Sequence, residues 1–487
     1  MLHAWITQPG LPLLQLSAND SMPPVLTQSR FYDWGQNTAD DPFLNEDPSA
    51  WYVPVAVGGL GSPAVVAGDG EDSWFEFSNR SQVVDGFDSS AGGLNLNAGG
   101  SGYYRVQYPP PHQQQLIALS NITSSIDGDS LPVLLQANAF ISDILHLSFS
   151  DNIKPSAILD LAAAVAAAPV SHTGFGLHLM MAPVVEGLQQ LTRFSTVLDA
   201  SEECRSELQA YAQHLLGLFA QPILDRIAQE PVPDFRNKYG SNYSVTQDTF
   251  LYDHVKGRVL LAAALSGHQP ARALLCRLYN DSRQGAPPGV DPDLLGAAYQ
   301  AAVAQLESCS TDARLVWNDM LTTWQTHPDI QEAERALYAM LRTPDADLLR
   351  QALDFSLMNN AVLSRSPGAR LGAVLRGAGG NPGSGGATGS DVAWQWVQDN
   401  FAAGNATKVL GALESLPFLP TQANLDRLGH FLELVPAESL PAIASKARLL
   451  ARLHHQVTWV QQHLKHESDL CLRASELVST ELPATAG

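Results

Sequence analysis

The pattern of apolar and polar positions divides the chain near Tyr108. Before that residue, apolar positions come in short stretches bounded by Gly, Pro, Asn and Asp, which is typical of β-strands. After it, apolar residues recur three and four positions apart, the spacing that places them on one face of a helix. The sequence therefore predicts a small sheet domain over residues 1–108 and a large helical domain over residues 112–470.

The last strand of the predicted sheet ends at Tyr108. Tyr104, Val106 and Tyr108 fall on one side of an extended strand, and mainly polar residues fall on the other. Glycines precede this stretch and permit a tight entry, and the prolines at 109–111 follow it. Because proline has no N–H to donate to a neighbouring strand, the sheet is expected to stop there.

Short apolar stretches with regular turn residues between them favour an antiparallel β-sandwich for the first domain. In the stretch around residue 75, Phe75 and Phe77 share one face of the strand while Glu76 lies on the other. The expected strands before the closing one are Pro12 to Leu16, Val25 to Tyr32, Trp51 to Val57, Ala64 to Ala67 and Ser73 to Ser78.

Helix pairs joined by short turns predict a solenoid of the HEAT or armadillo kind for the second domain. The sequence shows no fixed repeat, so an ordinary globular helical bundle remains an alternative. The expected helices are Leu116 to Leu119, Leu131 to Leu147, Ile158 to Ala168, Asp199 to Pro222, Phe250 to Leu265, Ala271 to Tyr279, Asp293 to Leu306, Thr311 to Thr326, Ile330 to Leu341, Asp345 to Met358, a helix opening at Asp391, and Leu440 to Leu464.

Two segments are expected to stay outside the packed helices. Residues 377–390 read GAGGNPGSGGATGS, which carries too little side chain to order itself and predicts a disordered, Gly-rich loop. Residues 475–487 close the chain and are predicted to form a flexible tail.

Composition and charge exclude several classes of protein. The 487 residues are 45% hydrophobic and 16% charged, and no apolar run reaches the ~20 residues that a membrane-spanning helix needs. The chain has 28 Lys and Arg against 49 Asp and Glu, a formal charge of −21 that repels a phosphate backbone. We therefore expect neither a membrane span nor a nucleic-acid partner.

The four cysteines, at positions 204, 276, 309 and 471, lie far apart with no C-x-x-C spacing. Most stand in helix-like sequence, where a free Cys behaves as a small apolar residue, so the sequence predicts neither a disulfide framework nor a zinc knuckle. A reducing compartment fits this pattern. The first residues, MLHAWITQPG, show no secretory signal, and we expect a cytoplasmic protein.

The search for catalytic chemistry nominates no residue. The sequence contains no H-E-x-x-H, no G-x-S-x-G, no P-loop and no G-x-G-x-x-G. His454, His455, His463 and His466 with Glu467 fit no zinc-protease pattern and are interpreted as a solvated helix face. A second pair of histidines beside a Gly-rich turn, His172 and His178 near Glu186, is interpreted as surface or core residues. We expect no catalytic, cofactor-binding or metal-binding residue in this chain.

Four segments resemble the zinc aminopeptidases related to aminopeptidase N, puromycin-sensitive aminopeptidase and the endoplasmic-reticulum aminopeptidases. They are the stretch LNLNAGGSGYYRVQY from Leu94 to Tyr108, the opening WITQPGLP from Trp5, the segment WYVPV from Trp51, and the helix VAWQWVQDNF from Val392 to Phe401. The resemblance implies the last two domains of that family, a β-sandwich and a helical bowl. It also implies that the zinc-binding catalytic domain would lie before Met1.

Two functions follow as expectations. In the first, the chain is the non-catalytic C-terminal part of a zinc aminopeptidase, which encloses peptide substrates and gates the active-site cavity, with zinc only in the absent domain. Its partners would be peptides and a catalytic aminopeptidase domain. In the second, the chain is a stand-alone helical scaffold that binds a peptide or a partner protein without enzymatic activity. In either case this chain alone is expected to be inactive as an enzyme.

Overall fold

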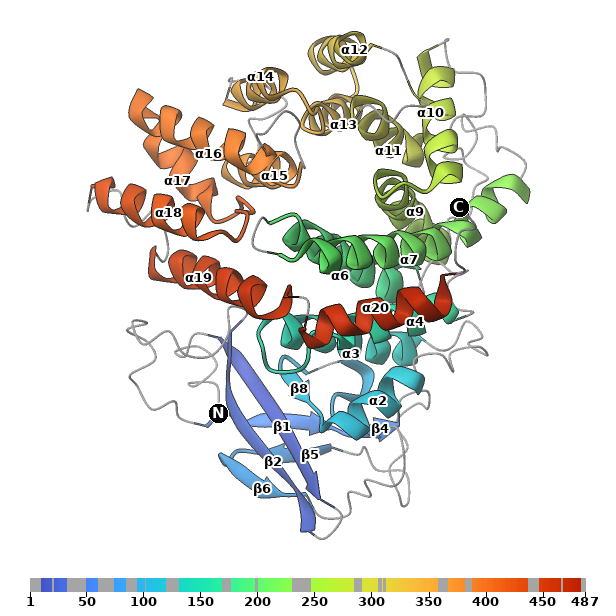
Figure 1. The fold of residues 1–487 in the computed structure, drawn as a ribbon, viewed down its shortest axis with the longest axis vertical. Helices are drawn as coiled ribbons and strands as arrows, with labels where there is room; N and C mark the ends of the chain where they lie inside the picture. The colour runs from blue at the N-terminus through green and yellow to red at the C-terminus, as the bar shows by residue number, and fades with distance from the viewer. Residues whose placement is uncertain are drawn as a thin grey trace. The chain divides into compact units, whose positions relative to one another are not determined.

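The structure is a computed structural model of the chain (Figure 1). It describes residues 10–19, 22–32, 50–59, 74–84, 94–100, 102–119, 131–168, 177–197, 200–229, 247–283, 291–304, 309, 312–357, 367–381, 388–436, 446–465 and 467–482. The described residues are mostly helical, with a small mixed sheet near the N-terminus. The expected strand Ala64 to Ala67 lies outside the described residues.

The chain forms two compact units. The first unit comprises residues 1–190, 200–211 and 458–487, and the second comprises residues 191–199 and 212–457. The first unit is therefore built from both ends of the chain. It groups the sheet with several helices, and the boundaries that the sequence suggests, 1–108 and 112–470, stay a prediction.

The sheet of the first unit is mixed, so the expectation of a purely antiparallel sheet was wrong. Its strand order is β6-β2-β1-β8, in which β1 pairs antiparallel with β2 and parallel with β8. A short connection forces β1 and β2 to run antiparallel, whereas β8 reaches the other edge of β1 after a long stretch of chain and can run in either direction. The strands are β1 Leu11–Asn19, β2 Met22–Phe31, β3 Val53–Ala56, β4 Gly58–Gly59, β5 Trp74–Phe77, β6 Ser81–Val83, β7 Leu94–Asn95 and β8 Arg105–Gln107.

Strand β8 and its flanking tyrosines have the alternation that the sequence predicts. Tyr104, Val106 and Tyr108 are buried, while Tyr103 is 74% exposed. The phenol of Tyr104 donates to the carbonyl oxygen of Leu96 at 2.7 Å, so the aromatic side chains also satisfy polar backbone groups inside the unit.

Arg105 joins β8 to helix α3 (Leu131–Phe149). Its Nη1 lies 3.1 Å from Asp143 Oδ1, and the backbone N–H of Val106 donates to Asp143 Oδ2 at 2.9 Å. The guanidinium also lies 5.7 Å from the centre of the Phe31 ring on β2. Burial raises the pKa of Asp143 to about 6, and the positive charge of Arg105 opposes that rise.

The C-terminal residues close the first unit through contacts with the end of α3 and the turn that follows it. Lys154 Nζ lies 3.1 Å from Asp469 Oδ1, and Trp459 Nε1 donates to Ser148 O at 2.9 Å. The tail expected from residue 475 was wrong as far as Leu482, because helix α20 (Asp469–Glu481) buries Leu470, Ala474 and Leu477. The other helices of this unit are α2 Pro110–Leu119, α4 Ala157–Ala167 and η4 Leu177–Met181, with parts of α6 Ala182–Ser195, α7 Glu202–Gln229 and α19 Lys446–His463.

Helices of the second unit alternate between two rows. α11 packs on α9 and α13, which form one row, while α10 packs on α9 and α11, and α12 packs on α11 and α13. Figure 1 shows α10 and α12 on the same side of the row of α9, α11 and α13. These helices are α9 Gln247–Leu265, α10 Gln269–Arg283, α11 Pro292–Val303, α12 Ala313–Thr326, α13 Ile330–Met340, α14 Ala346–Leu357, α15 Pro367–Gly379, α16 Gly389–Asn400, α17 Ala406–Leu413 and α18 Gln422–Leu434, with η5 Phe401–Asn405 between α16 and α17.

The predicted loop at 377–390 is ordered at both ends. Helix α15 continues to Gly379, and the side chain of Asn381 donates to the carbonyl oxygens of Leu341 and Thr343. Gly379 has no side chain to obstruct this packing, since a Cβ there would stand 2.6 Å from Pro417 Cδ. Thr388 then begins α16 with a capping box. Residues 382–387 lie outside the described residues.

All four cysteines form disulfides, so the expectation of free cysteines was wrong. Cys204 bonds Cys471 in the first unit, where their Cα atoms lie 5.1 Å apart, and Cys276 bonds Cys309 in the second, at 4.4 Å. Both separations fall in the range that a disulfide spans. The fold brings each pair of cysteines together, and their spacing along the sequence does not reveal the pairing.

Among the described residues, no helix combines the length and the apolar character that crossing a membrane requires.

Candidate functional site

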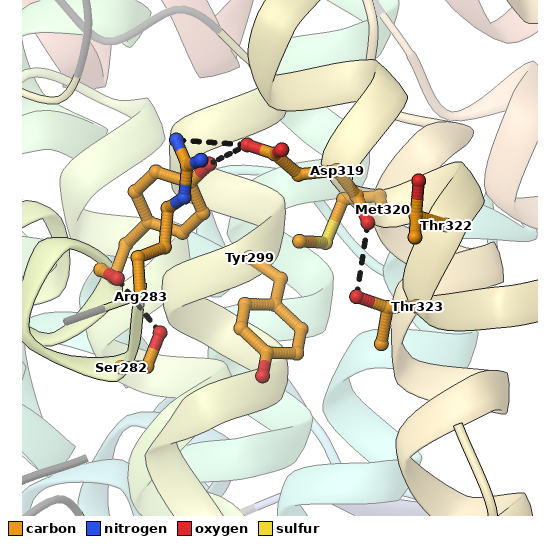
Figure 2. A pocket seen from close by; sticks show the side chains of 8 residues that line it. Ser282, Arg283, Tyr299, Asp319, Met320, Thr322 and Thr323 are labelled. Atoms are coloured by element: carbon orange, nitrogen blue, oxygen red, sulfur yellow. Dashed lines mark hydrogen bonds and ion pairs between the residues drawn. The ribbon is translucent and has the colours of Figure 1, made fainter. Parts of the chain in front are cut away.

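A cavity of about 280 Å³ lies among helices α10, α11 and α12 of the second unit (Figure 2). α10 contributes three of its side chains, α11 contributes one tyrosine and α12 contributes four. The lining residues are Tyr279, Ser282, Arg283, Tyr299, Asp319, Met320, Thr322 and Thr323. Most of them carry a hydroxyl or a charge, so the cavity is a polar one with Met320 as its aliphatic wall.

Asp319 organises the hydrogen bonds of this cavity. The phenol of Tyr279 donates to Asp319 Oδ2 at 3.1 Å, and Arg283 Nη1 lies 2.8 Å from the same oxygen. Burial raises the pKa of Tyr279 to about 12, with the charge of Asp319 adding to the rise. Burial and the charge of Glu332 likewise raise the pKa of Tyr299 to about 12. Both phenols stay protonated at neutral pH, so the cavity offers hydrogen bonds and no phenolate base.

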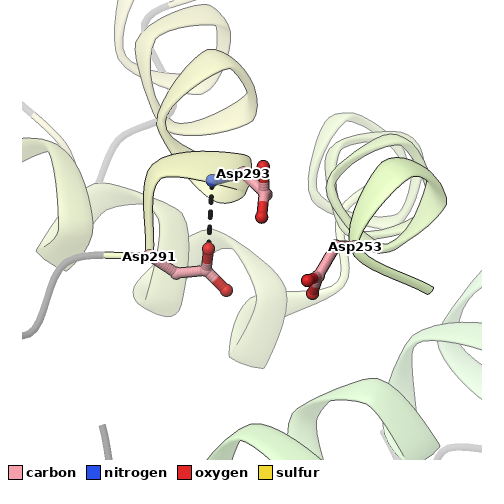
Figure 3. A group of neighbouring side chains, drawn as sticks. All are labelled: Asp253, Asp291 and Asp293. Atoms are coloured by element: carbon pink, nitrogen blue, oxygen red, sulfur yellow. Dashed lines mark hydrogen bonds between the residues drawn. The ribbon is translucent and has the colours of Figure 1, made fainter. Parts of the chain in front are cut away.

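A second group of side chains brings three carboxylates together (Figure 3). Oxygen atoms of Asp253 on α9 and of Asp291 and Asp293 at the start of α11 all lie within 4.8 Å of one another. Asp291 caps α11, because its Oδ1 accepts from the backbone N–H of Asp293 at 3.0 Å. Within the described part of the chain, these three aspartates are the His, Cys, Asp or Glu residues that lie close enough together to hold a metal ion.

Lys256 already supplies a cation to these aspartates. Its Nζ forms ion pairs with Asp253 and Asp291, and its side chain is 4% exposed. The ammonium also lies 5.6 Å from the centre of the Tyr252 ring. Carboxylates that lie close together need a positive charge between them, which a metal ion could supply. Here the buried ammonium of Lys256 already supplies it. We interpret the cluster as a set of ion pairs that links α9 to α11.

The histidines considered in the sequence do not converge among the described residues. His463 Nε2 lies 2.5 Å from Asp151 Oδ1 in the first unit, which makes it part of the packing of α19. His454 is exposed on the same helix. His178 stands in η4, whereas His172 and His466 lie outside the described residues. The expectation that this chain contains no catalytic or metal-binding residue stays a prediction.

Sequence reasoning identified neither the cavity nor the aspartate cluster. Arg283 and Asp319 are single charges on two helices, and the chain between them gives no sign that they meet. Asp291 carries a local signal, since Asp-Pro-Asp is a common start of a helix. That signal predicts a cap and says nothing about Asp253 or Lys256 on α9.

Comparison with known proteins identifies the family. Residues 94–416, about two thirds of the chain, match the model of the ERAP1-like C-terminal domain. The chain belongs to the ERAP1-like C-terminal domain family. The match begins at Leu94, which is also where the stretch that resembles the zinc aminopeptidases begins.

Similarity to two known aminopeptidases agrees with this family assignment. It is 24% identical over 370 residues to the puromycin-sensitive aminopeptidase of Caenorhabditis elegans, a match that covers 74% of this chain and 33% of the relative. It is also 24% identical over 414 residues to aminopeptidase M1-A of Oryza sativa subsp. japonica, covering 82% of this chain and 39% of the relative. The matches thus span about a third to two fifths of each relative's length.

Proposed function

We propose that this chain is the non-catalytic C-terminal part of a zinc aminopeptidase and that it encloses peptide substrates and gates the cavity where they are cut. The observation that carries the proposal is the match to the ERAP1-like C-terminal domain over residues 94–416. The two relatives support it further, because both are named as aminopeptidases and the match covers less than half of each.

The arrangement of helices in the second unit suits an enclosing wall. Alternate helices contact one another along α9, α11 and α13, with α10 and α12 covering one side of them. A wall of this kind resembles the predicted HEAT-like solenoid, which we retain as a proposal. In such a stack each helix pair buries its apolar stripe against its neighbours, and the exposed side of a row can line a space for an elongated ligand.

The metal would act in the absent domain. The sequence has no H-E-x-x-H segment, in which two histidines one helical turn apart hold Zn²⁺ and the intervening glutamate activates its water. The one described acidic cluster is paired with Lys256. The proposal therefore assigns hydrolysis to a catalytic domain and assigns peptide enclosure to this chain.

The compartment of the protein can be tested through its cysteines. The sequence analysis expects a cytoplasmic protein, whereas the two disulfides favour an oxidising compartment. Counting thiols in the native protein, by alkylation before and after reduction followed by mass spectrometry, separates the two. Zero free thiols before reduction supports the oxidising compartment, and four free thiols supports the cytoplasm.

The test of the proposed function combines mass, metal and activity. Antibodies against the 487-residue chain would purify the native protein, whose mass, zinc content and hydrolysis of aminoacyl-4-nitroanilides are then measured. A larger, zinc-containing protein that releases 4-nitroaniline supports the proposal, provided that the 487-residue chain alone does not. A native protein of 52.3 kDa, without zinc and inactive even with its partners, would support the scaffold alternative instead.

A further inference from the structure

The cavity of α10, α11 and α12 contains two opposite charges, Arg283 and Asp319, that can form further hydrogen bonds. Arg283 Nη1 binds Asp319 Oδ2 at 2.8 Å, and the guanidinium also contacts Tyr279. A guanidinium carries five N–H donors and a carboxylate accepts through two oxygens. Among the described residues, several N–H groups of Arg283 and the Oδ1 atom of Asp319 have no further partner. The side chain of Arg283 is 50% exposed, so a ligand can reach it.

The adjacency of these charges selects a particular class of ligand. A carboxylate would bind the open edge of the Arg283 guanidinium, and an ammonium would bind Asp319 Oδ1. Because Arg283 and Asp319 touch each other, the two groups of the ligand must also lie close together. An α-amino acid carries both on one carbon, whereas a dipeptide separates them by a further Cα to Cα step of about 3.8 Å.

The rest of the cavity suits the side chain of such a ligand. Figure 2 shows Tyr299 and Met320 beside the Arg283 and Asp319 pair, where an aromatic ring and a thioether give an apolar wall. The volume of about 280 Å³ is just below the range of drug-sized pockets, about 300–1,000 Å³, and admits one amino acid. The hydroxyls of Thr322 and Thr323 donate to backbone carbonyls, so their oxygens can still accept a hydrogen bond.

We propose that this cavity is a binding site for a free α-amino acid with an apolar side chain. The carboxylate lies on Arg283, the ammonium on Asp319, and the side chain against Tyr299 and Met320. Both phenols remain protonated at neutral pH and keep donating to carboxylates, so the charge balance of the cavity is constant across the neutral range. The proposal does not depend on peptide enclosure, since it concerns the α10, α11 and α12 helices alone.

Isothermal titration of the 487-residue chain with L-leucine tests the site directly. We expect saturable binding of one leucine per chain at concentrations up to about 10 mM, the affinity range of a ligand of this size. L-leucinamide lacks the carboxylate and N-acetyl-L-leucine lacks the ammonium, and each should bind at least about tenfold more weakly. L-leucyl-L-leucine should also bind more weakly, because its two charges are further apart.

Variants locate the binding within the chain. Arg283→Met and Asp319→Asn should each weaken leucine binding at least about tenfold, and Thr322→Trp should block the exposed rim of the cavity without changing a charge. Asp399→Asn is the matched control, since it removes the carboxylate of another Arg–Asp pair, with Arg350, that does not line this cavity. Thermal unfolding of each variant confirms that it is folded.

Three results would overturn the proposal. They are the absence of saturable leucine binding, equal binding of leucinamide and leucine, and binding that Arg283→Met, Asp319→Asn and Thr322→Trp all leave unchanged. None of these results bears on the enclosure of peptides, because no peptide substrate and no catalytic domain enters the experiment.

Discussion

The two compact units differ in how far apart their contacting residues lie along the sequence. In the first unit, Cys204 and Cys471 are 267 positions apart, and Lys154 and Asp469 are 315 apart. In the second, Cys276 and Cys309 are 33 apart. We therefore infer that the first unit depends on both ends of the chain, whereas helices α9 to α13 of the second unit pack on helices close to them in the sequence. The predictions below test this difference, from the largest expected effect to the smallest.

Deleting residues 467–487, which include α20, should have the largest effect. The first unit would lose the burial of Leu470, Ala474 and Leu477 together with the Cys204–Cys471 disulfide, a combined loss of about 10 kcal/mol. We expect hydrogen exchange in α4 to become fast while exchange in α11 stays slow. Deleting only residues 483–487 is the control and should change neither helix. Unchanged protection of α4 in the longer deletion would contradict the account.

Removing each disulfide separately compares the two units at matched chemistry. The chain-entropy model assigns about 5–6 kcal/mol to the loop that Cys204 and Cys471 close and about 4 kcal/mol to that of Cys276 and Cys309. The double variant Cys204→Ala with Cys471→Ala should therefore unfold in less urea than Cys276→Ala with Cys309→Ala. Equal midpoints would show that the longer loop is already restricted in the unfolded chain.

Lys256→Met should destabilise the second unit by about 3–5 kcal/mol. The change leaves Asp253 and Asp291 close together and half-buried without a cation. Lys154→Met is the control in the first unit, because that lysine is 76% exposed and its pair with Asp469 is worth under about 1 kcal/mol. Urea unfolding of both variants measures the difference between their losses in unfolding free energy. Equal losses would show that Lys256 contributes no more to stability than Lys154.

The pH dependence of the first unit should include a contribution from Asp143. Its pKa is about 6 in the folded chain and 3.8 in the reference state, so folding favours the protonated carboxyl. That contribution is complete below about pH 4 and is lost as the pH rises through 6. The difference in unfolding free energy between the wild type and Asp143→Asn should fall by about 2 kcal/mol from pH 4 to pH 7. A constant difference would mean that Asp143 stays ionised throughout.

The helices of the second unit were largely predictable because each carries its own pattern. α12 and α13 begin at Asp312 and Asp329, whose carboxylates cap them, and apolar residues follow at helical spacing. Among the helices that the sequence did not reveal, α15 is rich in glycine and α17 has only 8 residues, so their local preference is weak. α18 has 13 residues and a cap at Thr421, a local signal that the sequence analysis missed. Helix α7 also continues past Pro222, since packing of its apolar face outweighs the missing N–H.

The parts that could not be predicted depend on distant residues. The disulfide partners, the parallel pairing of β8 with β1 and the docking of α20 all join segments that no local pattern connects. The same holds for the candidate site, where Arg283 and Asp319 face each other from two helices. The family resemblance of Leu94 to Tyr108 was readable because one continuous stretch of sequence, from β7 through η1 to β8, carries it.

The measurement that tests the central claim most directly follows peptide binding and peptide hydrolysis by the purified 487-residue chain. Both are measured with added zinc and without it. We predict that fluorescent peptides bind and remain intact, since the proposed function assigns enclosure to this chain and hydrolysis to a catalytic domain. Release of N-terminal residues by the zinc-loaded chain alone would contradict the account, and so would an intact chain that binds no peptide of any length.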